Sequence, residues 1–537
     1  MLQILPTFRK TALQTTIVLI FLSCRLLLDS NMSGFVWNEV DVLPLAKQFV
    51  DRSWIATDWY LNLETNYRFL FQAIFGWSIV HFGFLATSII GRLICYSLVA
   101  LGIVLLGHKL RLSFPYLLLV TVVVTYQGYL QGAIAGEWFV GGLEAKAVAY
   151  GLVLIAIPLM LGRRYIPMAL LLGLATSFHV LVGGWAFVTT IGWLGLRPKQ
   201  RLFKLGRVVW LLLPIYLIAS AFAIPVLLQQ LLSSEPLGNI SPSFIYVFLR
   251  LPHHLNPFAW HPILWIRLVV YLLLWAGCMV SLKKEADLRG WTTGDYARFE
   301  LTEFTLISLI PFIGGLAIAF VDRQGEWLQY YPFRFGDVML PLTTCLLVAC
   351  NMESKFSVQK KKFRPLLIAV LIGILFTQVT VFTQQAIASQ EFPSERQDVN
   401  PQWKSMSDWI HEHTPKDAII ISHPWKLASF TWTSERATIV KLKMFPQTKK
   451  SIVEYYERLN DLSDGALAKI YFGDDEFERI KTVKAISEGF SHLSTDRVTK
   501  LMEKYHASYF LTEVEHHLDL EIVHSQAPYV LYARPKS

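Results

Sequence analysis

The chain has 537 residues, of which 53% are hydrophobic and only 17% are charged. A soluble globular protein averages about 25% charged residues, so this composition excludes an ordinary soluble domain and indicates that much of the chain lies in lipid. The net charge of +9 fits the Lys and Arg residues that gather in cytoplasmic loops of membrane proteins better than it fits nucleic-acid binding. No nucleic-acid partner is therefore expected.

Apolar segments follow one another through the first 390 residues, and most approach the roughly 20 residues that a helix needs to cross a bilayer. The first is longer than the apolar region of a signal peptide, about 7–15 residues, and is expected to be a retained helix. The segments are 12–29, 69–87, 89–107, 113–130, 148–162, 165–178, 181–196, 207–229, 262–281, 303–321, 335–350 and 366–386.

Basic residues between these segments set the expected topology, because cytoplasmic loops are enriched in Lys and Arg. The basic clusters best fall on one side of the membrane if segment 69–87 does not span it. We therefore expect 69–87 to lie beside the membrane or to re-enter it, and the remaining segments to form about eleven spans. The N-terminus is then cytoplasmic, and the outward regions are 30–68, 131–147, 230–261, 322–334 and the tail after 386. The clusters are Arg9/Lys10, Lys109/Arg111, Arg163/Arg164, the 197–207 run, Lys283/Lys284 and Lys355 with 360–364.

The tail differs in composition from the rest and predicts a soluble α/β domain. Short apolar runs flanked by polar residues predict buried strands at 417–422, 437–442, 507–513 and 529–533, with helices near 447–462, 474–489 and 495–505. The predicted domains are thus 1–390, a multi-spanning domain with a first outward loop 30–68 and a juxtamembrane piece 69–87, and 391–537, a periplasmic or lumenal domain.

Carboxylates gather in the first outward loop, where Trp and Tyr residues suit a membrane interface. Glu39, Asp41 and Asp58 follow the first helix. A general base must reach the proton that it takes, with its pKa tuned by burial. One reading is therefore a catalytic loop that meets a lipid headgroup, and the other is an ordinary hydrated loop.

Ionisable residues also stand at the mouths of later spans. Glu144 and Lys146 enter the span at 148–162, and His179 lies between two apolar segments on the outer side. Ionisable groups at membrane depth are expensive and indicate function. The alternatives are a local Glu–Lys pair that starts a helix and a hydrogen-bonded packing histidine.

Arginines at the last outward loop complete the set of candidates. Arg323 and Arg334 precede the span 335–350, and a guanidinium there can bind a phosphate through two hydrogen bonds. A snorkelling anchor, or an internal pair of Arg334 with Asp337, would explain the same residues. The sequence contains neither a P-loop nor a Gly-rich dinucleotide motif, so no nucleotide cofactor is expected.

These features together resemble the GT-C superfamily, the multi-spanning glycosyltransferases that use polyprenyl-phosphate sugars. The resemblance covers nearly the whole chain and is one of pattern. It rests on the first outward loop, with its turn Thr57-Asp58-Trp59, on Tyr67–Phe71 and the span that follows, and on the outward α/β tail. Glu144-Ala145-Lys146 and Phe178-His179 look closer to a bacterial subgroup than to protein mannosyltransferases.

The resemblance implies an inverting transfer of a sugar from a polyprenyl-phosphate donor to a lipid, glycan or protein acceptor at the outer face of a bacterial inner membrane. An acidic residue of the first loop, Glu39 or Asp41, would be the base or would hold a divalent metal, Mg or Mn, with Asp58. Cations would bind the donor phosphate, and the candidates are Lys146, Arg323 and Arg334. Glu144, His179 and Asp337 would line the site with Asp58.

Two other classes fit the same sequence. A transporter or flippase of a lipid-linked or anionic solute also carries ionisable residues near the ends of its spans, although no internal repeat of two similar halves is visible. A scaffold would use its tail to bind a partner. Convergence of Glu39, Asp41, Glu144 and Arg334 on one outward cavity favours an enzyme, whereas a path through the membrane favours a transporter.

Overall fold

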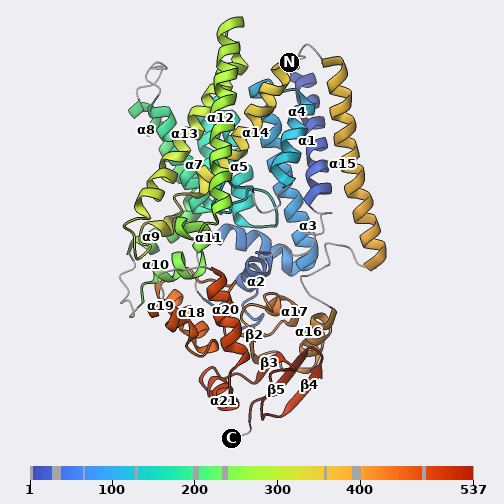
Figure 1. Ribbon diagram of the computed structural model, residues 1–537, viewed down its shortest axis with the longest axis vertical. Coiled ribbons are helices and arrows are strands. Elements are labelled where there is room, and N and C mark those ends of the chain that lie inside the picture. The colour runs from blue at the N-terminus through green and yellow to red at the C-terminus, as the bar shows by residue number, and fades with distance from the viewer. Residues whose placement is uncertain are drawn as a thin grey trace.

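The protein is a bundle of long helices with a smaller sheet-containing domain at one end, and the two chain termini lie at opposite ends of the molecule (Figure 1). The computed structural model describes residues 4–26, 38–63, 67–126, 131–196, 205–232, 240–355, 360–389, 401–473 and 479–535. This architecture confirms the predicted fold class, a helical membrane protein with a C-terminal α/β domain.

The bundle is built from helices that coincide with the predicted apolar segments, since each segment overlaps a described helix. The helices are α1 (Ile4–Leu26), α2 (Glu39–Val50), α3 (Phe69–Leu110), α4 (Phe114–Tyr126), α5 (Ala145–Leu161), α6 (Tyr165–Phe178), α7 (Val180–Gly195), α8 (Leu205–Ala219), α9 (Ile224–Leu232), α12 (Pro262–Arg289), α13 (Thr293–Ile318), α14 (Arg334–Lys355) and α15 (Lys360–Ser389). Short turns join them: η2 (Ala221–Ala223), α10 (Pro242–Phe244), η3 (Ile245–Arg250), α11 (Pro252–Leu255), η4 (Pro257–Ala259) and η5 (Leu328–Tyr330).

Within the described residues, four helices are long and apolar enough to cross a membrane by length and composition: α3, α12, α13 and α14. A fifth candidate is the pair Trp210–Ala219 and Ala221–Gln230, which is bent by 65°. The shorter apolar helices are Phe114–Tyr126, Ala145–Leu161, Tyr165–Phe178, Val180–Gly195 and Pro365–Val381. The chain is therefore an integral membrane protein, while the number of about eleven spans stays a prediction.

Helix α3 carries both segments that the sequence analysis separated, 69–87 and 89–107. Its backbone leaves the helical conformation at Gly83 (φ 79°, ψ 172°), so α3 consists of two helical parts. The first part packs tightly on α2, because a Cβ at Gly76 would lie 2.0 Å from the backbone oxygen of Ala46. The break falls inside the segment predicted not to span; whether 69–87 lies beside the membrane stays a prediction.

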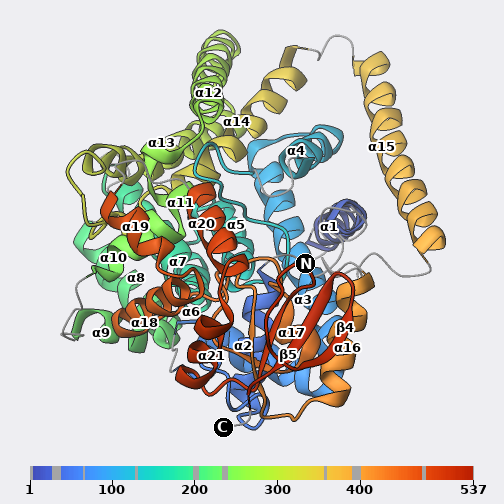
Figure 2. The ribbon, with the colours of Figure 1, turned by 60° about the horizontal axis from the view of Figure 1, so that its bottom comes forward.

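The C-terminal domain has a five-stranded sheet in the order β2-β1-β3-β5-β4, with helices packed around it (Figure 2). Strands β2, β1 and β3 are parallel, whereas β5 runs antiparallel to β3 and to β4. Four of the strands match predicted ones. The strands are β1 (Ile419–Ser422), β2 (Ala437–Thr438), β3 (Tyr509–Glu513), β4 (Ile522–Gln526) and β5 (Tyr529–Ala533). The helices are α16 (Pro401–His413), α17 (Phe430–Ser434), α18 (Lys449–Leu462), α19 (Ala466–Gly473), α20 (Arg479–Ser491) and α21 (Thr495–Lys504).

The domain packs directly against the loops at one end of the bundle. Ile245 of η3 belongs to the same buried apolar cluster as Phe445 of the domain. Tyr60, in the loop after α2, belongs to another cluster, which includes Met444. Lys47 on α2 pairs with Glu435 at 3.2 Å. Because apolar side chains from both parts share these clusters, the domain is held firmly over this end of the bundle.

Asp58 makes a hydrogen-bonded link across this contact. Its Oδ1 accepts the backbone N–H of Leu61 at 2.9 Å, and its Oδ2 accepts that of Thr438 at 3.0 Å. The residue is 1% exposed. Both of its oxygens thus face backbone amides at the domain contact, which gives Asp58 a docking role.

Docking through Asp58 predicts a pH dependence of stability. Burial raises the pKa of Asp58 from 3.8 to about 6, against the opposing effect of the amide hydrogen bonds. A carboxyl whose pKa is higher in the folded protein favours folding most at low pH, and its contribution is lost as pH rises through about 6. A difference of this size corresponds to about 3 kcal/mol. We expect the wild type to lose stability relative to Asp58→Asn between about pH 4 and pH 7.

Thermal unfolding of the two proteins in detergent across this pH range measures the effect. The exposed Asp417 provides a control, because Asp417→Asn should follow the wild type at every pH. Parallel curves for the wild type and Asp58→Asn would contradict the assignment of the raised pKa to this carboxyl.

Candidate functional site

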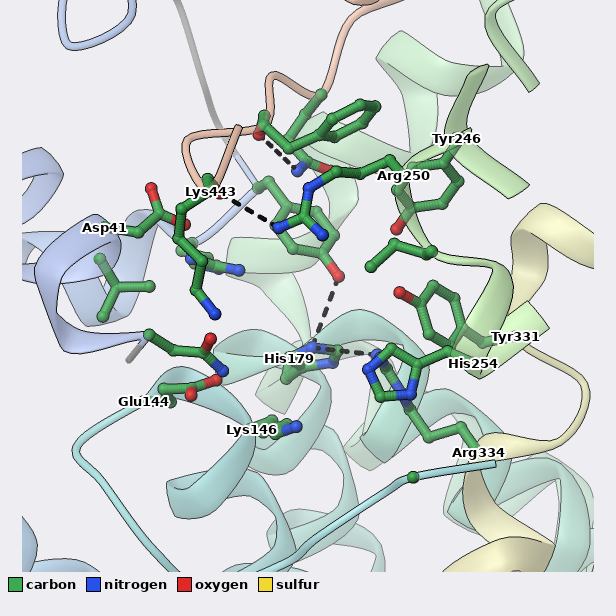
Figure 3. A pocket seen from close by; sticks show the side chains of 18 of the residues that line it. Asp41, Glu144, Lys146, His179, Tyr246, Arg250, His254, Tyr331, Arg334 and Lys443 are labelled. Atoms are coloured by element: carbon green, nitrogen blue, oxygen red, sulfur yellow. Dashed lines mark hydrogen bonds between the residues drawn. The ribbon is translucent and has the colours of Figure 1, made fainter. Parts of the chain in front are cut away.

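A cavity of about 380 Å³ lies where the bundle meets the C-terminal domain (Figure 3). This volume lies within the usual range for small-molecule sites, about 300–1,000 Å³. Parts of the chain that are far apart in sequence form its wall. The lining residues are Asn38, Asp41, Val42, Tyr67, Arg68, Gly136, Trp138, Glu144, Lys146, His179, Tyr246, Arg250, Leu251, His253, His254, Tyr331, Arg334, Lys443, Phe445 and Gln447.

The wall of the cavity is strongly cationic. Five of its side chains are Lys or Arg and two are carboxylates, so the basic groups outnumber the acidic ones. Helices α5, α7 and α14 also begin at the cavity, with Glu144 and His179 as N-caps and Arg334 as a first residue. The positive ends of these helix dipoles add to the charge of the side chains. The cavity is therefore suited to an anionic ligand.

Asp41 brings a carboxylate into the cavity from α2. It is 9% exposed, and its Oδ1 accepts a hydrogen bond from the Tyr60 hydroxyl at 2.7 Å. Burial raises the pKa of Asp41, against the opposing effects of the charge of Arg68 and of the Tyr60 hydrogen bond. Asp41 thus has the properties of a general base: partial burial, access to a cavity and a raised pKa.

Glu39, the other predicted base, lies on a different face of α2 and is not among the cavity-lining residues. Arg92 binds both of its carboxylate oxygens, with Nε to Oε1 at 2.8 Å and Nη2 to Oε2 at 2.6 Å. The Ser88 hydroxyl and the backbone N–H of Leu143 also donate to it. Glu39 is fully buried and its oxygens are occupied, so the geometry gives it a structural role and favours Asp41 as the base.

Arg334 and Lys146, predicted to bind phosphate, both line the cavity and meet at one buried carboxylate, Glu137. Arg334 Nε donates to Glu137 Oε1 at 2.9 Å, and Lys146 Nζ lies 3.6 Å from Glu137 Oε2. Burial opposes ionisation of Glu137, but the charges of Arg334 and Lys146 outweigh it and lower its pKa to about 2. The two cations and Glu137 therefore carry one net positive charge at the cavity.

His179, predicted to line the site, lies on the cavity wall beside this cluster. Its Nε2 is 3.3 Å from Arg334 Nη1 and 3.5 Å from the Tyr67 hydroxyl, and its Nδ1 accepts the backbone N–H of Val182. Burial, with the nearby charge of Arg334, lowers the pKa of His179 well below 6.5. The imidazole is thus neutral at neutral pH and adds no charge to the site.

Glu144 also lines the cavity, and its side chain is 6% exposed. It is the N-cap residue of α5, but its side chain makes no capping hydrogen bond. Lys146 forms its ion pair with Glu137 and acts on Glu144 through a charge interaction, so the alternative of a local Glu–Lys ion pair that starts the helix is not what the structure shows.

Asp337 is buried away from the cavity, so its predicted site-lining role is not what the structure shows. Its Oδ1 accepts the backbone N–H groups of Ile134 and Ala135, and its Oδ2 accepts that of Glu137. It makes no pair with Arg334 in these contacts. Asp337 fixes the loop 131–144, which carries Glu137 and Glu144, and so acts on the site through this loop.

Arg323 does not reach the cavity. Its side chain is exposed, and it is absent from the lining residues. The cavity wall instead contains three cationic residues that the sequence analysis did not select: Arg68, Arg250 and Lys443. All three interact electrostatically with Asp41, and Arg250 Nη2 donates to the backbone oxygen of Lys443 at 3.4 Å.

The predicted metal pair does not fit the geometry. Asp58 uses both oxygens on backbone amides, whereas Asp41 faces the cavity. In the part of the chain that the structure describes, no group of three or more His, Cys, Asp or Glu side chains is arranged to hold a metal. We therefore derive no chemistry through Mg or Mn at Asp41 and Asp58.

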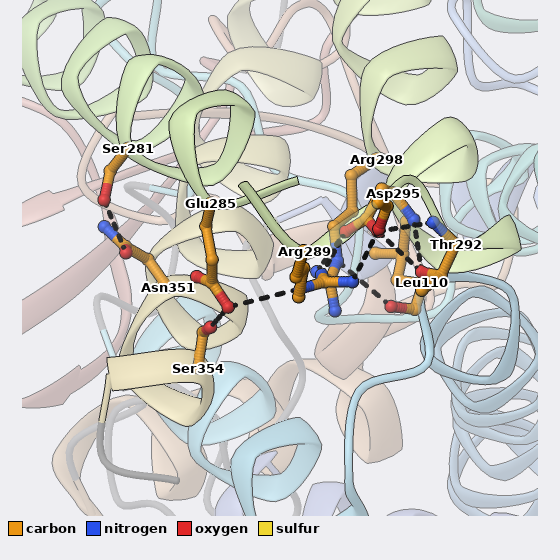
Figure 4. Close-up of polar contacts among 10 residues, drawn as sticks. Leu110, Ser281, Glu285, Arg289, Thr292, Asp295, Arg298, Asn351 and Ser354 are labelled. Carbon is orange, nitrogen blue, oxygen red and sulfur yellow. Dashed lines mark hydrogen bonds and ion pairs between the residues drawn. The ribbon is translucent and has the colours of Figure 1, made fainter. Parts of the chain in front are cut away.

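Polar contacts join α12, α13 and α14 (Figure 4) at the end of the bundle away from the C-terminal domain (Figure 1). Asp295 accepts hydrogen bonds from Arg289 and Arg298, and Arg298 also donates to the backbone oxygen of Leu110. Helices α3, α5 and α14 run from the cavity to this end, so the basic clusters near Lys109, Arg163 and Lys355 lie there. The cavity and these basic clusters are at opposite ends; their sides of the membrane stay a prediction.

The fold and the site define a class, an integral membrane protein with a cationic cavity beneath a C-terminal α/β domain. A family model described as a domain of unknown function (DUF6798) matches residues 401–462, which form part of the C-terminal domain. No curated protein matches the chain.

Two solved structures share its overall course over 98% of both chains. They are crystal structures of ArnT from Cupriavidus metallidurans, one bound to undecaprenyl phosphate and one in the apo state, each with 11% sequence identity and with TM-scores of 0.45 and 0.43.

Proposed function

We propose that the chain is a glycosyltransferase that moves a sugar from a polyprenyl-phosphate-linked donor to an acceptor at the outer face of the membrane. The observation that carries the proposal is that a buried carboxylate, Asp41, faces two cations, Lys146 and Arg334, across one cavity (Figure 3). An inverting displacement needs this arrangement, because the attacking and leaving groups lie on opposite sides of the anomeric carbon.

In the proposed reaction, Asp41 takes the proton of an acceptor hydroxyl as its oxygen bonds to the anomeric carbon. The bond between that carbon and the phosphate oxygen breaks, and polyprenyl phosphate leaves with the electron pair. Lys146 and Arg334 stabilise the negative charge that develops on the phosphate. Glu137 keeps both cations in place before the donor arrives. Since a phosphate leaves readily as an anion, the step needs no general acid.

The position of the cavity supports the proposed routes of the substrates. The lipid-linked donor comes from the membrane, because Lys146 and Arg334 stand at the ends of apolar helices. The acceptor, a lipid, glycan or protein, comes from the side of the C-terminal domain, which supplies Lys443 and Phe445 to the wall. We propose the periplasmic face of a bacterial inner membrane as the place of the reaction, with a cytoplasmic N-terminus.

The test is transfer of radiolabelled sugar from a panel of polyprenyl-phosphate donors by the purified protein in lipid nanodiscs. We expect label to reach an acceptor and free polyprenyl phosphate to be released in equal amount, with no transfer from nucleotide sugars. Absence of transfer over the panel, together with movement of the labelled lipid across proteoliposomes, would overturn the proposal in favour of a transporter.

Tyr60 gives the proposed base a recognisable pH signature. Its hydroxyl hydrogen-bonds to the Asp41 carboxylate and thereby lowers the pKa of Asp41, which burial raises. In Tyr60→Phe the pKa of Asp41 rises further. Because the base must be deprotonated, the acidic limb of kcat/KM against pH is expected to move to higher pH, with little change well above it.

Initial transfer rates between about pH 4 and pH 8 measure this shift. Tyr67→Phe is the matched control, because Tyr67 also lines the cavity but its hydroxyl faces His179. A Tyr60→Phe profile that is lowered equally at all pH values would contradict the coupling of Tyr60 to the base.

A further inference from the structure

Glu144 has a buried carboxylate oxygen without a hydrogen-bond partner. Its Oε1 is buried and accepts no hydrogen bond, while the side chain lines the cavity and keeps 6% of its surface exposed. A buried polar atom without a partner costs free energy, so its presence in a folded protein calls for an explanation. The start of α5 does not provide one, because the Glu144 side chain does not cap the helix.

Two cations already act on the negative charge of Glu144, whereas no donor uses the hydrogen-bonding capacity of its Oε1. Lys146 and Arg68 both interact electrostatically with it. An additional cation is therefore not what the site lacks. A neutral hydrogen-bond donor would satisfy the oxygen and leave the charge balance unchanged, and hydroxyl groups are such donors.

The neighbours of Glu144 also define where such a ligand would lie. Lys146 belongs to the Glu137–Arg334 cluster, where the proposed function puts the departing phosphate. Arg68 interacts with Asp41, the proposed base. Glu144 interacts with both cations and is therefore near the space between the leaving group and the base, which the transferred sugar ring must occupy.

We propose that Glu144 accepts hydrogen bonds from ring hydroxyls of the transferred sugar and thereby determines which sugar the enzyme takes. The inference rests on the proposed function and names the part of the donor that Glu144 recognises. A site built to bind a substrate hydroxyl strongly rejects an analogue that lacks it, because its polar group is left unpaired. The preferred donor thus carries free hydroxyls on the side of the ring that faces α5, and the matching deoxy sugar is a poor substrate.

Equilibrium binding separates recognition of the sugar from recognition of the lipid phosphate. The probes are polyprenyl phosphate, polyprenyl-phosphoglucose, polyprenyl-phosphomannose and their monodeoxy derivatives, and the protein is the full chain in nanodiscs. The variants are Glu144→Leu, which removes the acceptor, and Glu144→Gln, which keeps a neutral carbonyl. Glu326→Gln is the matched control, since Glu326 is exposed and does not line the cavity.

The wild type should bind one glycosylated lipid more tightly than polyprenyl phosphate and should lose this gain with one of the deoxy derivatives. Glu144→Leu should weaken binding of the glycosylated lipid by about 100-fold and Glu144→Gln by about 10-fold, the range of hydrogen bonds to a charged group. Both variants should bind polyprenyl phosphate at least as tightly as the wild type, because they remove a negative charge that acts on Lys146 and Arg68, and both should retain its unfolding temperature.

Two results would overturn the inference, and they are distinguishable from each other. If the sugar improves binding to the wild type but the Glu144 variants keep this gain, or lose affinity for both kinds of lipid equally, Glu144 does not recognise the sugar and the proposed function stands. If the sugar adds nothing to the affinity of the wild type while the transfer assay detects transfer, the inference fails and the proposed function stands; if transfer is absent as well, both fail.

Discussion

Replacing Asp41 with asparagine is expected to lower kcat for sugar transfer by about 10²- to 10⁴-fold, the usual contribution of a general base. Asparagine has nearly the same shape, and its amide oxygen still accepts a hydrogen bond from the Tyr60 hydroxyl, but it cannot take a proton from the acceptor. Because Asp41 borders the cavity and, in the part of the chain that the structure describes, forms no ion pair, the variant should fold normally. Initial rates at saturating donor measure the loss, and donor affinity should change little.

Glu39→Gln is the informative comparison, because the two carboxylates are only two residues apart. Glutamine leaves the buried Arg92 guanidinium without its counter-charge, and breaking a buried ion pair costs about 3–5 kcal/mol. The expected result is a large drop in unfolding temperature and protein yield, with transfer per folded molecule preserved. The opposite pattern, an inactive but stable Glu39→Gln beside an active Asp41→Asn, would show that Glu39 is the base.

The sequence identified the acidic loop but could not choose between Glu39 and Asp41. Two residues apart on an α-helix, their side chains point about 200° from one another, so only one of them can face a given cavity. Which one does depends on what packs on α2. The partner of Glu39, Arg92, lies on α3 within an apolar segment, and nothing in the local pattern links these two residues.

The cations of the cavity could also be predicted only in part, because local sequence does not show which residues distant in the chain reach the cavity. Lys146 and Arg334 were predicted because each stands where an outward loop enters an apolar helix. Arg68 satisfies the same criterion at the start of α3 and could have been found by it. Lys443 could not, because it lies in the C-terminal domain and reaches the cavity only through the docking of that domain.

Prediction of the fold succeeded where the signal is local. Apolar runs identified the helices of the bundle, and β1, β3 and β5 are short apolar runs with buried side chains. Strand β4 was missed because it is an edge strand whose residues, Ile522–Gln526, are mostly exposed and partly polar. The apolar pattern on which the prediction relied is absent from such a strand.

Arg334→Ala is expected to have the second large effect, because it changes both the chemistry and the stability of the site. The variant removes a cation from the proposed phosphate site, and stabilising charge on a leaving group typically contributes about 10²- to 10³-fold in kcat. It also leaves Glu137, which is 1% exposed, with only Lys146 at 3.6 Å and His254 at 4.0 Å. The free energy of unfolding is therefore expected to fall by about 3–5 kcal/mol.

Combining Arg334→Ala with Glu137→Gln separates these two effects. The second change removes the uncompensated buried charge, so most of the lost unfolding temperature should return. Transfer should stay low, because the phosphate still lacks the guanidinium. Thermal unfolding and initial transfer rates of the two single variants and the double variant form a cycle that measures the coupling of Arg334 to Glu137. If the double variant regains transfer along with stability, Arg334 serves only to balance Glu137, and the donor phosphate must bind at Lys146 or at the other cations of the cavity, Arg68, Arg250 and Lys443.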